Sequence, residues 1–124
     1  MLSPDVAFGY DEMAVALIGL QRFSEAASAE SQAIRLSDGK YGWMHFNLGS
    51  AYFKQENWSF ASQSYEKAAE LSPQEPAAAF NVALCNQRLG HFVEAAHWYE
   101  EYLHRKPDAD DRTEILERIR ALKR

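Results

Sequence analysis

The chain has 124 residues, of which 47% are hydrophobic and 25% are charged, and its formal net charge is −5. This size and composition fit one globular domain and exclude a disordered segment. Its one cluster of basic residues lies in 118–124, so nucleic acid is not an expected partner. No apolar run approaches the ~18 residues that a membrane span needs. With a single cysteine, Cys85, and no signal peptide expected at the start, we expect a cytoplasmic protein.

The sequence repeats itself at intervals of 34 or 35 residues. An aromatic residue followed three positions later by alanine occurs at 23 and 26, at 58 and 61, and at 92 and 95. Tyr65 and Tyr99 also lie 34 residues apart. The first interval is one residue longer, and we expect the extra residue in a loop near Asp38 and Gly39. A fixed period of this length indicates a protein built of stacked repeats.

Each repeat predicts two amphipathic helices joined by a short turn. Apolar residues recur at helical spacing at positions 13, 14, 17 and 20, and the later repeats keep this pattern. We expect the turns at 21–22, 56–57 and 90–91. Asn57 and Gly90 suit the left-handed backbone conformation that ends many helices. Pro73 and Pro107 end the second helices of the last two repeats, because proline cannot continue a helix.

Small residues are predicted where the two helices of each hairpin approach one another. They are Ala14, Gly49 and Ala83 on first helices and Ala26, Ala61 and Ala95 on second helices. We expect Phe23, Trp58 and Phe92 to fill the space beside them. One hairpin cannot bury its apolar face alone, whereas about three stacked hairpins can.

The middle repeat resembles the tetratricopeptide repeat (TPR). The matching residues are Leu48, Gly49, Tyr52, Ala61, Tyr65, Ala68 and Pro73. The third repeat departs from the pattern at Asn86 and Tyr102, and the first lacks the closing proline. The resemblance implies an all-α, α-α superhelix (TPR solenoid) of three antiparallel helical hairpins plus a C-terminal capping helix. The implied repeats cover about 7–40, 42–75 and 76–109, and the implied capping helix covers about 109–123.

The expected capping helix has an ordered charge pattern and one apolar stripe. Acidic residues come first and basic residues last, which complements the helix dipole. The stripe consists of Ile115, Leu116, Ile119 and Leu122, and we expect it to pack on the third hairpin. The other faces are charged and keep the end of the stack soluble.

The resemblance further implies that the first helices line a concave groove that binds a protein or peptide ligand. We expect this ligand to be an extended peptide or a partner helix. The groove residues implied in the first hairpin are Phe8, Asp11, Glu12 and Val15. Those in the second are Trp43, Phe46, Asn47, Ser50, Phe53 and Lys54, and those in the third are Phe80, Asn81, Leu84, Gln87 and Arg88. Aromatic residues on an exposed face favour a binding surface.

Asn47 and Asn81 are equivalent in the repeat, and a side-chain amide can both donate to and accept from a peptide backbone. They could form a ladder along a bound peptide, or asparagine could simply be common at this place in the family. Heat-shock co-chaperones of the family grip a C-terminal carboxylate with basic and amide side chains. Of the matching positions only Asn47 fits, and Asp11 would repel such a ligand, so we do not expect this function.

No catalytic site, cofactor site or metal site is predicted, and we do not expect an enzyme. His97, Glu101 and His104 share one helix face, a spacing that could present metal ligands. They fall on a second helix without a fourth ligand, and a solvated face explains them. Cys85 lies in mid-helix, where it is expected to be a small packed side chain.

Three alternatives to groove binding stay open from the sequence. Leu2, Ser3 and Pro4 occupy the register of 71–73, so they either end a preceding repeat or simply start the first helix. In the first case, uncovered apolar side chains in 2–8 could drive self-assembly through the repeat ends. The chain could also be an accessory domain of a larger protein, or bind partners on the convex face.

Overall fold

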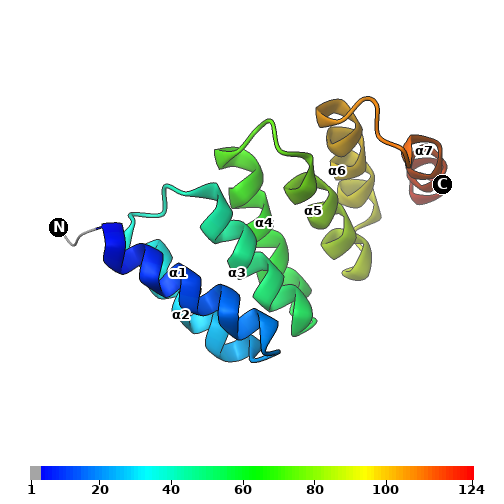
Figure 1. The fold of residues 1–124 in the computed structure, drawn as a ribbon. Coiled ribbons are helices and arrows are strands. Elements are labelled where there is room, and N and C mark those ends of the chain that lie inside the picture. Colours follow the sequence, from blue (N-terminus) through cyan, green and yellow to red (C-terminus); the bar gives the residue numbers. More distant parts are fainter. Residues whose placement is uncertain (1–3) are drawn as a thin grey trace.

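The computed structural model describes residues 4–124, which form seven helices and no strand. The helices are α1 (Pro4–Gly19), α2 (Phe23–Leu36), α3 (Gly42–Lys54), α4 (Trp58–Leu71), α5 (Pro76–Arg88), α6 (Phe92–Arg105) and α7 (Arg112–Leu122). Three antiparallel hairpins, α1–α2, α3–α4 and α5–α6, follow one another in a row that ends with α7 (Figure 1). Each second helix also contacts the first helix of the next hairpin. The predicted all-α repeat architecture is confirmed.

Each hairpin turns through one residue in the left-handed backbone region. The φ angle is +62° at Gln21, +57° at Glu56 and +79° at Gly90. The prediction for Gly90 is confirmed, but that for Asn57 is wrong, because its φ angle is −88°. The left-handed residue comes one position earlier, and this leaves the Asn57 side chain to accept a hydrogen bond from the Phe60 amide at 3.4 Å. Asn57 therefore caps the start of α4.

The connection between the first two hairpins is longer by one residue than the next connection. Residues 37–41 join α2 to α3, whereas residues 72–75 join α4 to α5. Both Asp38 and Gly39 have positive φ angles, and the Gly39 carbonyl lies 2.9 Å from Nε2 of His45. The extra residue thus lies where the repeat interval predicted it.

The small residues at the helix crossings are buried as predicted. The alanines at 14, 26, 61, 83 and 95 are fully inaccessible to solvent. A Cβ atom at Gly49 would lie 2.8–3.0 Å from three ring carbons of Tyr65, which is too close for two carbon atoms. The absence of a side chain at Gly49 therefore allows α3 and α4 to approach this closely.

The expectation for the aromatic residue beside each crossing holds less well at the C-terminal end. Phe23 and Trp58 are half-buried, but Phe92 is 51% exposed, so its predicted filling role is wrong. Trp58 packs edge-on against Phe53 at 4.9 Å between ring centroids. Gln87 stands at the position equivalent to Phe53, and it offers Phe92 no ring to pack against.

The apolar stripe of α7 packs on the third hairpin as predicted. Ile115 and Ile119 are buried, and Leu116 and Leu122 pack against the same cluster, which includes Tyr99. The helix begins at Arg112, a few residues later than expected, because 108–111 form a turn in which Ala109 is buried. The proposed alignment of Leu2 and Ser3 with a preceding repeat lies outside the described residues.

A methyl group at Gly49 is expected to destabilise the fold. Because Gly49→Ala pushes a carbon atom into the Tyr65 ring, we expect the free energy of unfolding to fall by about 1–3 kcal/mol. Gly9→Ala is the matched control, since a Cβ atom there meets no heavy atom within 4 Å. The control should gain up to about 1 kcal/mol from its helix propensity. Urea unfolding followed by circular dichroism checks both values, and unchanged stability of Gly49→Ala would contradict the close approach.

Candidate functional site

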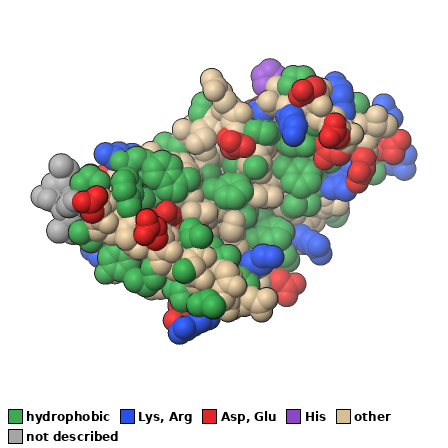
Figure 2. Space-filling model, in the orientation of Figure 1, with side chains coloured by type: hydrophobic (Ala, Val, Ile, Leu, Met, Phe, Trp, Pro, Cys, Tyr) green, Lys and Arg blue, Asp and Glu red, His purple; other side chains and the backbone are tan. Residues whose placement is uncertain are grey.

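The candidate site is the surface formed by α1, α3 and α5 together with the adjoining side of α7, here called the first-helix face. Hydrophobic side chains gather over α1 and α3 with acidic side chains among them, and charged side chains of both signs cover α7 (Figure 2). The groove residues expected from the sequence are all at least partly accessible. Trp43 is 48% and Val15 is 50% exposed.

Two pockets on this face are related by the repeat. The first, of about 370 Å³, lies between the second and third hairpins, and the second, of about 340 Å³, lies between the third hairpin and α7. The first is lined by Gly42, Trp43, Phe46, Asn47, Ala68, Ser72, Glu75, Ala77 and Ala78. The second is lined by Glu75, Pro76, Ala77, Phe80, Asn81, Tyr102, Lys106 and Asp111. Phe80 and Asn81 follow Phe46 and Asn47 by 34 residues, so the two pockets are equivalent.

Three aromatic rings form a cluster at the N-terminal ends of α1 and α3. The centroids of Tyr41 and Trp43 lie 4.4 Å apart, and Phe8 lies 5.5 Å from the first and 6.1 Å from the second. Tyr41 was not among the expected site residues, because it precedes the first turn of α3. The cluster adds a largely apolar surface beside the first pocket.

Several of the expected polar residues form hydrogen bonds within the protein. The Ser50 hydroxyl lies 3.0 Å from the Tyr65 hydroxyl, and Nδ2 of Asn47 donates a hydrogen bond to Oδ1 of Asp11 at 3.1 Å. Asn81 makes no such bond within the part of the chain that the structure describes. The two amides therefore differ, although they are equivalent in sequence.

Glu30 is a residue of this site that sequence reasoning missed. It lies on α2 at the position where the later hairpins carry Tyr65 and Tyr99, and it is completely buried. Neither carboxyl oxygen has a hydrogen-bond partner among residues 4–124. Aligning the first repeat with the other two at this position would have found it, since a carboxyl there replaces a buried phenol.

The surroundings of Glu30 favour its neutral form. The pKa of Glu30 is raised to about 9, mainly by burial and further by the neighbouring Asp11 carboxylate, while the Asn47 amide opposes the rise. Glu30 is thus protonated at neutral pH. Its proton lets it act as a donor toward this part of the first-helix face.

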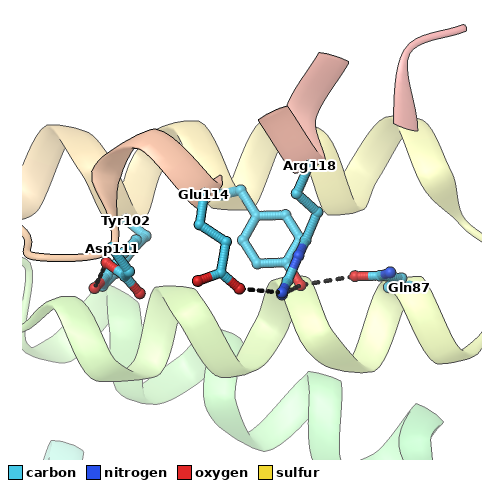
Figure 3. A network of polar contacts seen from close by, with 6 residues as sticks. Gln87, Tyr102, Asp111, Glu114 and Arg118 are labelled. Atoms are coloured by element: carbon cyan, nitrogen blue, oxygen red, sulfur yellow. Dashed lines mark hydrogen bonds and ion pairs between the residues drawn. The ribbon is translucent and has the colours of Figure 1, made fainter. Parts of the chain in front are cut away.

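The charged side of α7 also belongs to the face. Arg118 donates to the Tyr99 hydroxyl at 3.2 Å and to Glu114 at 3.2 Å, and the Tyr99 hydroxyl donates to Gln87 at 2.7 Å (Figure 3). At the start of α7, the Tyr102 hydroxyl donates to Asp111 at 2.9 Å. These bonds tie α7 to the groups that α5 and α6 present on the face.

The repeat period of the sequence indicates these α7 residues as part of the face. Asp111, Glu114 and Arg118 follow the face residues Ala77, Phe80 and Leu84 by 34 residues. The repeat period thus continues into α7. A helix expected only to cap the stack also extends the face.

Basic residues lie at the C-terminal ends of the first helices. Lys54 is exposed, and the Arg88 guanidinium lies 5.5 Å from the ring centroid of Trp58. Arg88 and Arg118 line a third pocket of about 610 Å³ together with Leu84, Gln87 and Phe92. This edge is positive, whereas α1 contributes Asp11 and Glu12 at the other end of the face.

The remaining candidates from the sequence offer no chemistry on this face. Within 4–124, no group of three or more histidine, cysteine, aspartate or glutamate side chains is placed to hold a metal ion. Cys85 is buried, and burial raises the pKa of its thiol to about 12. No helix in the described chain is both long and apolar enough to cross a membrane.

Comparison with known proteins places these features in a family. A family model of the tetratricopeptide repeat matches residues 48–120. Human Superkiller complex protein 3 is 34% identical over 82 residues, which cover 66% of this chain and 5% of that protein. The DnaJ homolog subfamily C member 7 homolog of Dictyostelium discoideum is 37% identical over 65 residues, which cover 52% of this chain and 12% of that protein. The chain thus spans a small part of the length of both relatives.

Solved structures share the whole fold at low sequence identity. The first TPR of Spaghetti (RPAP3), bound to an HSP90 peptide, superposes with a TM-score of 0.85 at 19% identity, covering 99% of this chain and 98% of that chain. The Yersinia enterocolitica type III secretion chaperone SycD, in complex with a peptide of the translocator YopD, gives a TM-score of 0.85 at 18% identity. That match covers 98% of this chain and 95% of the SycD chain.

Glu30 gives the free energy of unfolding a specific pH dependence. Its carboxyl titrates near 4.5 in the unfolded chain and near 9 in the folded chain, so between these values the folded state binds the extra proton. The contribution of Glu30 to the free energy of unfolding is therefore largest below about pH 4.5, and it falls as the pH rises toward 9.

We expect Glu30→Gln to remove this dependence, because an amide can donate without a titrating proton. The free energy of unfolding of the variant should exceed that of wild type by about 1–3 kcal/mol near pH 8, with the difference shrinking toward pH 5. Urea unfolding across this range measures it. Glu117→Gln, on the exposed side of α7, is the control and should track wild type. A difference between Glu30→Gln and wild type that does not change with pH would contradict a protonated Glu30.

Proposed function

The chain belongs to the tetratricopeptide repeat family, and we propose that it is a protein-interaction module that holds an extended peptide or a partner helix on its first-helix face. The observation that carries this proposal is the pair of equivalent pockets on that face. Each has a phenylalanine and an asparagine in its lining, and part-exposed aromatic rings lie beside the first. Such surfaces supply the anchor sites of protein interfaces.

The spacing of the pockets suits an extended ligand. Neighbouring packed helices lie ~10 Å apart, and an extended peptide advances ~3.3 Å per residue. Side chains about three residues apart on a peptide would therefore reach both pockets. Asn81, whose amide makes no side-chain hydrogen bond among residues 4–124, is suited to hold the peptide backbone between them, whereas Asn47 keeps its carbonyl for that purpose.

The similar structures support the general class of function. The first TPR of Spaghetti (RPAP3) binds an HSP90 peptide, and SycD binds a peptide of YopD. The acidic HSP90 peptide is not the ligand proposed for this chain. The Asp11 carboxylate lies on the face at a position where it would repel an acidic ligand. It also accepts the hydrogen bond that the Asn47 amide could otherwise donate to a ligand.

A second candidate is assembly through the ends of the stack. A pocket of about 470 Å³ lies between α6 and α7, with Leu103, Pro107, Leu116 and Ile119 among its lining residues. An apolar surface at the end of a repeat stack could receive a further helix. This candidate predicts a molecular mass that rises with concentration and does not depend on the first-helix face. The large size of the relatives also suits a module within a longer protein.

Loss of the face residues should abolish partner binding. We expect Trp43→Ala/Asn81→Ala to weaken binding of a captured partner at least about tenfold, because a part-exposed tryptophan is a frequent anchor in interfaces. The measurement is affinity capture from the source lysate with mass spectrometry, followed by titration of the partner into each variant.

Phe60→Ala is the control, because Phe60 is an aromatic residue of α4 that is 51% exposed and packs against the ring of Tyr52. It should keep the affinity of wild type. Circular dichroism must show that both variants are folded. A partner held equally by the face variant and the control would place binding elsewhere, on the second helices or at the ends of the stack.

A further inference from the structure

Two carboxyl groups, those of Glu30 and Asp11, lie where α1 packs against α2 and α3. Glu30 is completely buried, and neither of its carboxyl oxygens has a partner among the described residues. Asp11 accepts one hydrogen bond, from Asn47 at 3.1 Å. Because Glu30 is neutral, its buried oxygens need no counter-charge, and the Asp11 carboxylate, which accepts one hydrogen bond, keeps lone pairs for a cationic group.

The other two hairpins show where the Glu30 carboxyl points. At the equivalent position the Tyr65 hydroxyl lies 3.0 Å from Ser50, and the Tyr99 hydroxyl donates to Gln87 at 2.7 Å. In both, the polar end of a buried side chain reaches a polar group of the first-helix face. The Glu30 carboxyl likewise reaches Asp11 and Asn47, which act on it from α1 and α3. The first hairpin alone presents two carboxyl groups there.

Aromatic rings lie about one helical turn before Asp11 and Asn47 on their helices. Phe8 precedes Asp11 on α1, and Trp43 precedes Asn47 on α3, with 6.1 Å between the two ring centroids. The ammonium group of Lys40 already lies 5.3 Å from the centroid of Tyr41, the third ring of this cluster. The 48% exposed Trp43 leaves a further ring surface on which a cation from outside could stack.

The charge of α1 also favours a cationic ligand. This helix carries Asp5, Asp11 and Glu12 and no lysine or arginine. The other two first helices each end with a basic residue, Lys54 on α3 and Arg88 on α5. A cationic ligand group is therefore attracted to α1 more than to α3 or α5.

We propose that the junction of α1 and α3 is a subsite for a cationic side chain, an arginine or lysine of a peptide bound on the first-helix face. The cation stacks on Trp43 and Phe8 and donates hydrogen bonds to the Asp11 carboxylate, with Glu12 beside it. Glu30 lies behind Asp11 in its neutral form, so the charge of the site comes from Asp11 and Glu12. This subsite rests on the proposed function, because it needs a peptide to lie on the face. A bare metal ion is not the occupant, since the described residues place no three ligands together.

Selection from a displayed library of random dodecapeptides tests the subsite. We expect peptides selected on wild type to be enriched in arginine or lysine at one position. The enrichment should be lost on Asp11→Asn/Glu12→Gln, in which the side chains keep their shape. It should persist on Glu66→Gln/Glu70→Gln, which neutralises two carboxylates on the second helix α4.

A selected peptide then gives the size of the effect by calorimetry. Replacing its arginine with citrulline, which removes the charge and keeps the shape, should weaken binding to wild type about tenfold. On the Asp11→Asn/Glu12→Gln variant the two peptides should bind equally.

The outcomes separate the subsite from the proposed function. Peptides that need Trp43 and Asn81 but show no cationic enrichment overturn the subsite and leave the proposed function in place. An arginine preference that survives Asp11→Asn/Glu12→Gln also overturns the subsite. Absence of any peptide that depends on the face overturns both proposals.

Discussion

The contact between the two helices of each hairpin is the constraint on which the rest of the structure depends. Gly49 lies directly against the Tyr65 ring, and the equivalent alanines are fully buried. This close approach fixes the position of the residue at the crossing, which is Glu30, Tyr65 or Tyr99. Each of these side chains is packed at the crossing of the two helices, so its polar end is directed at the first-helix face. There it approaches Asp11, Ser50 or Gln87. Packing in the core thus determines the polar groups of the surface.

The repeat makes the face periodic, and departures from the repeat make it specific. Equivalent pockets recur around Phe46 and Phe80, which suits a ligand with regularly spaced side chains. The two ends of the face differ because single residues differ. Glu30 replaces a tyrosine at the α1 end, and Arg118 of α7 adds a cation at the other end. A repeated scaffold with different ends can bind a peptide in one orientation, because the two orientations place its charges differently.

The sequence predicted the fold well because its signals are local and repeated. Each signal depends only on residues close together in the chain. Helical spacing predicts the helices, Gly90 predicts a turn, and the prolines after α4 and α6 predict helix ends. The candidate site was predicted less completely, because it depends on contacts between helices. The bond from Asn47 to Asp11 joins residues 36 apart in the chain, and no local pattern reports it. Arg118, by contrast, was accessible through the repeat period and was overlooked because α7 matched the charge pattern of a cap.

The footprint of a bound ligand on the isotope-labelled protein tests the central claim most directly. A peptide or partner segment retained by the wild-type chain is titrated in, and the chemical shifts of the backbone amides and tryptophan indoles are followed by NMR. If the first-helix face is the binding surface, the shifts concentrate on α1, α3, α5 and the adjoining side of α7, and the indole of Trp43 moves further than that of Trp98. Shifts that concentrate on the outer sides of α2, α4 and α6 would contradict the claim.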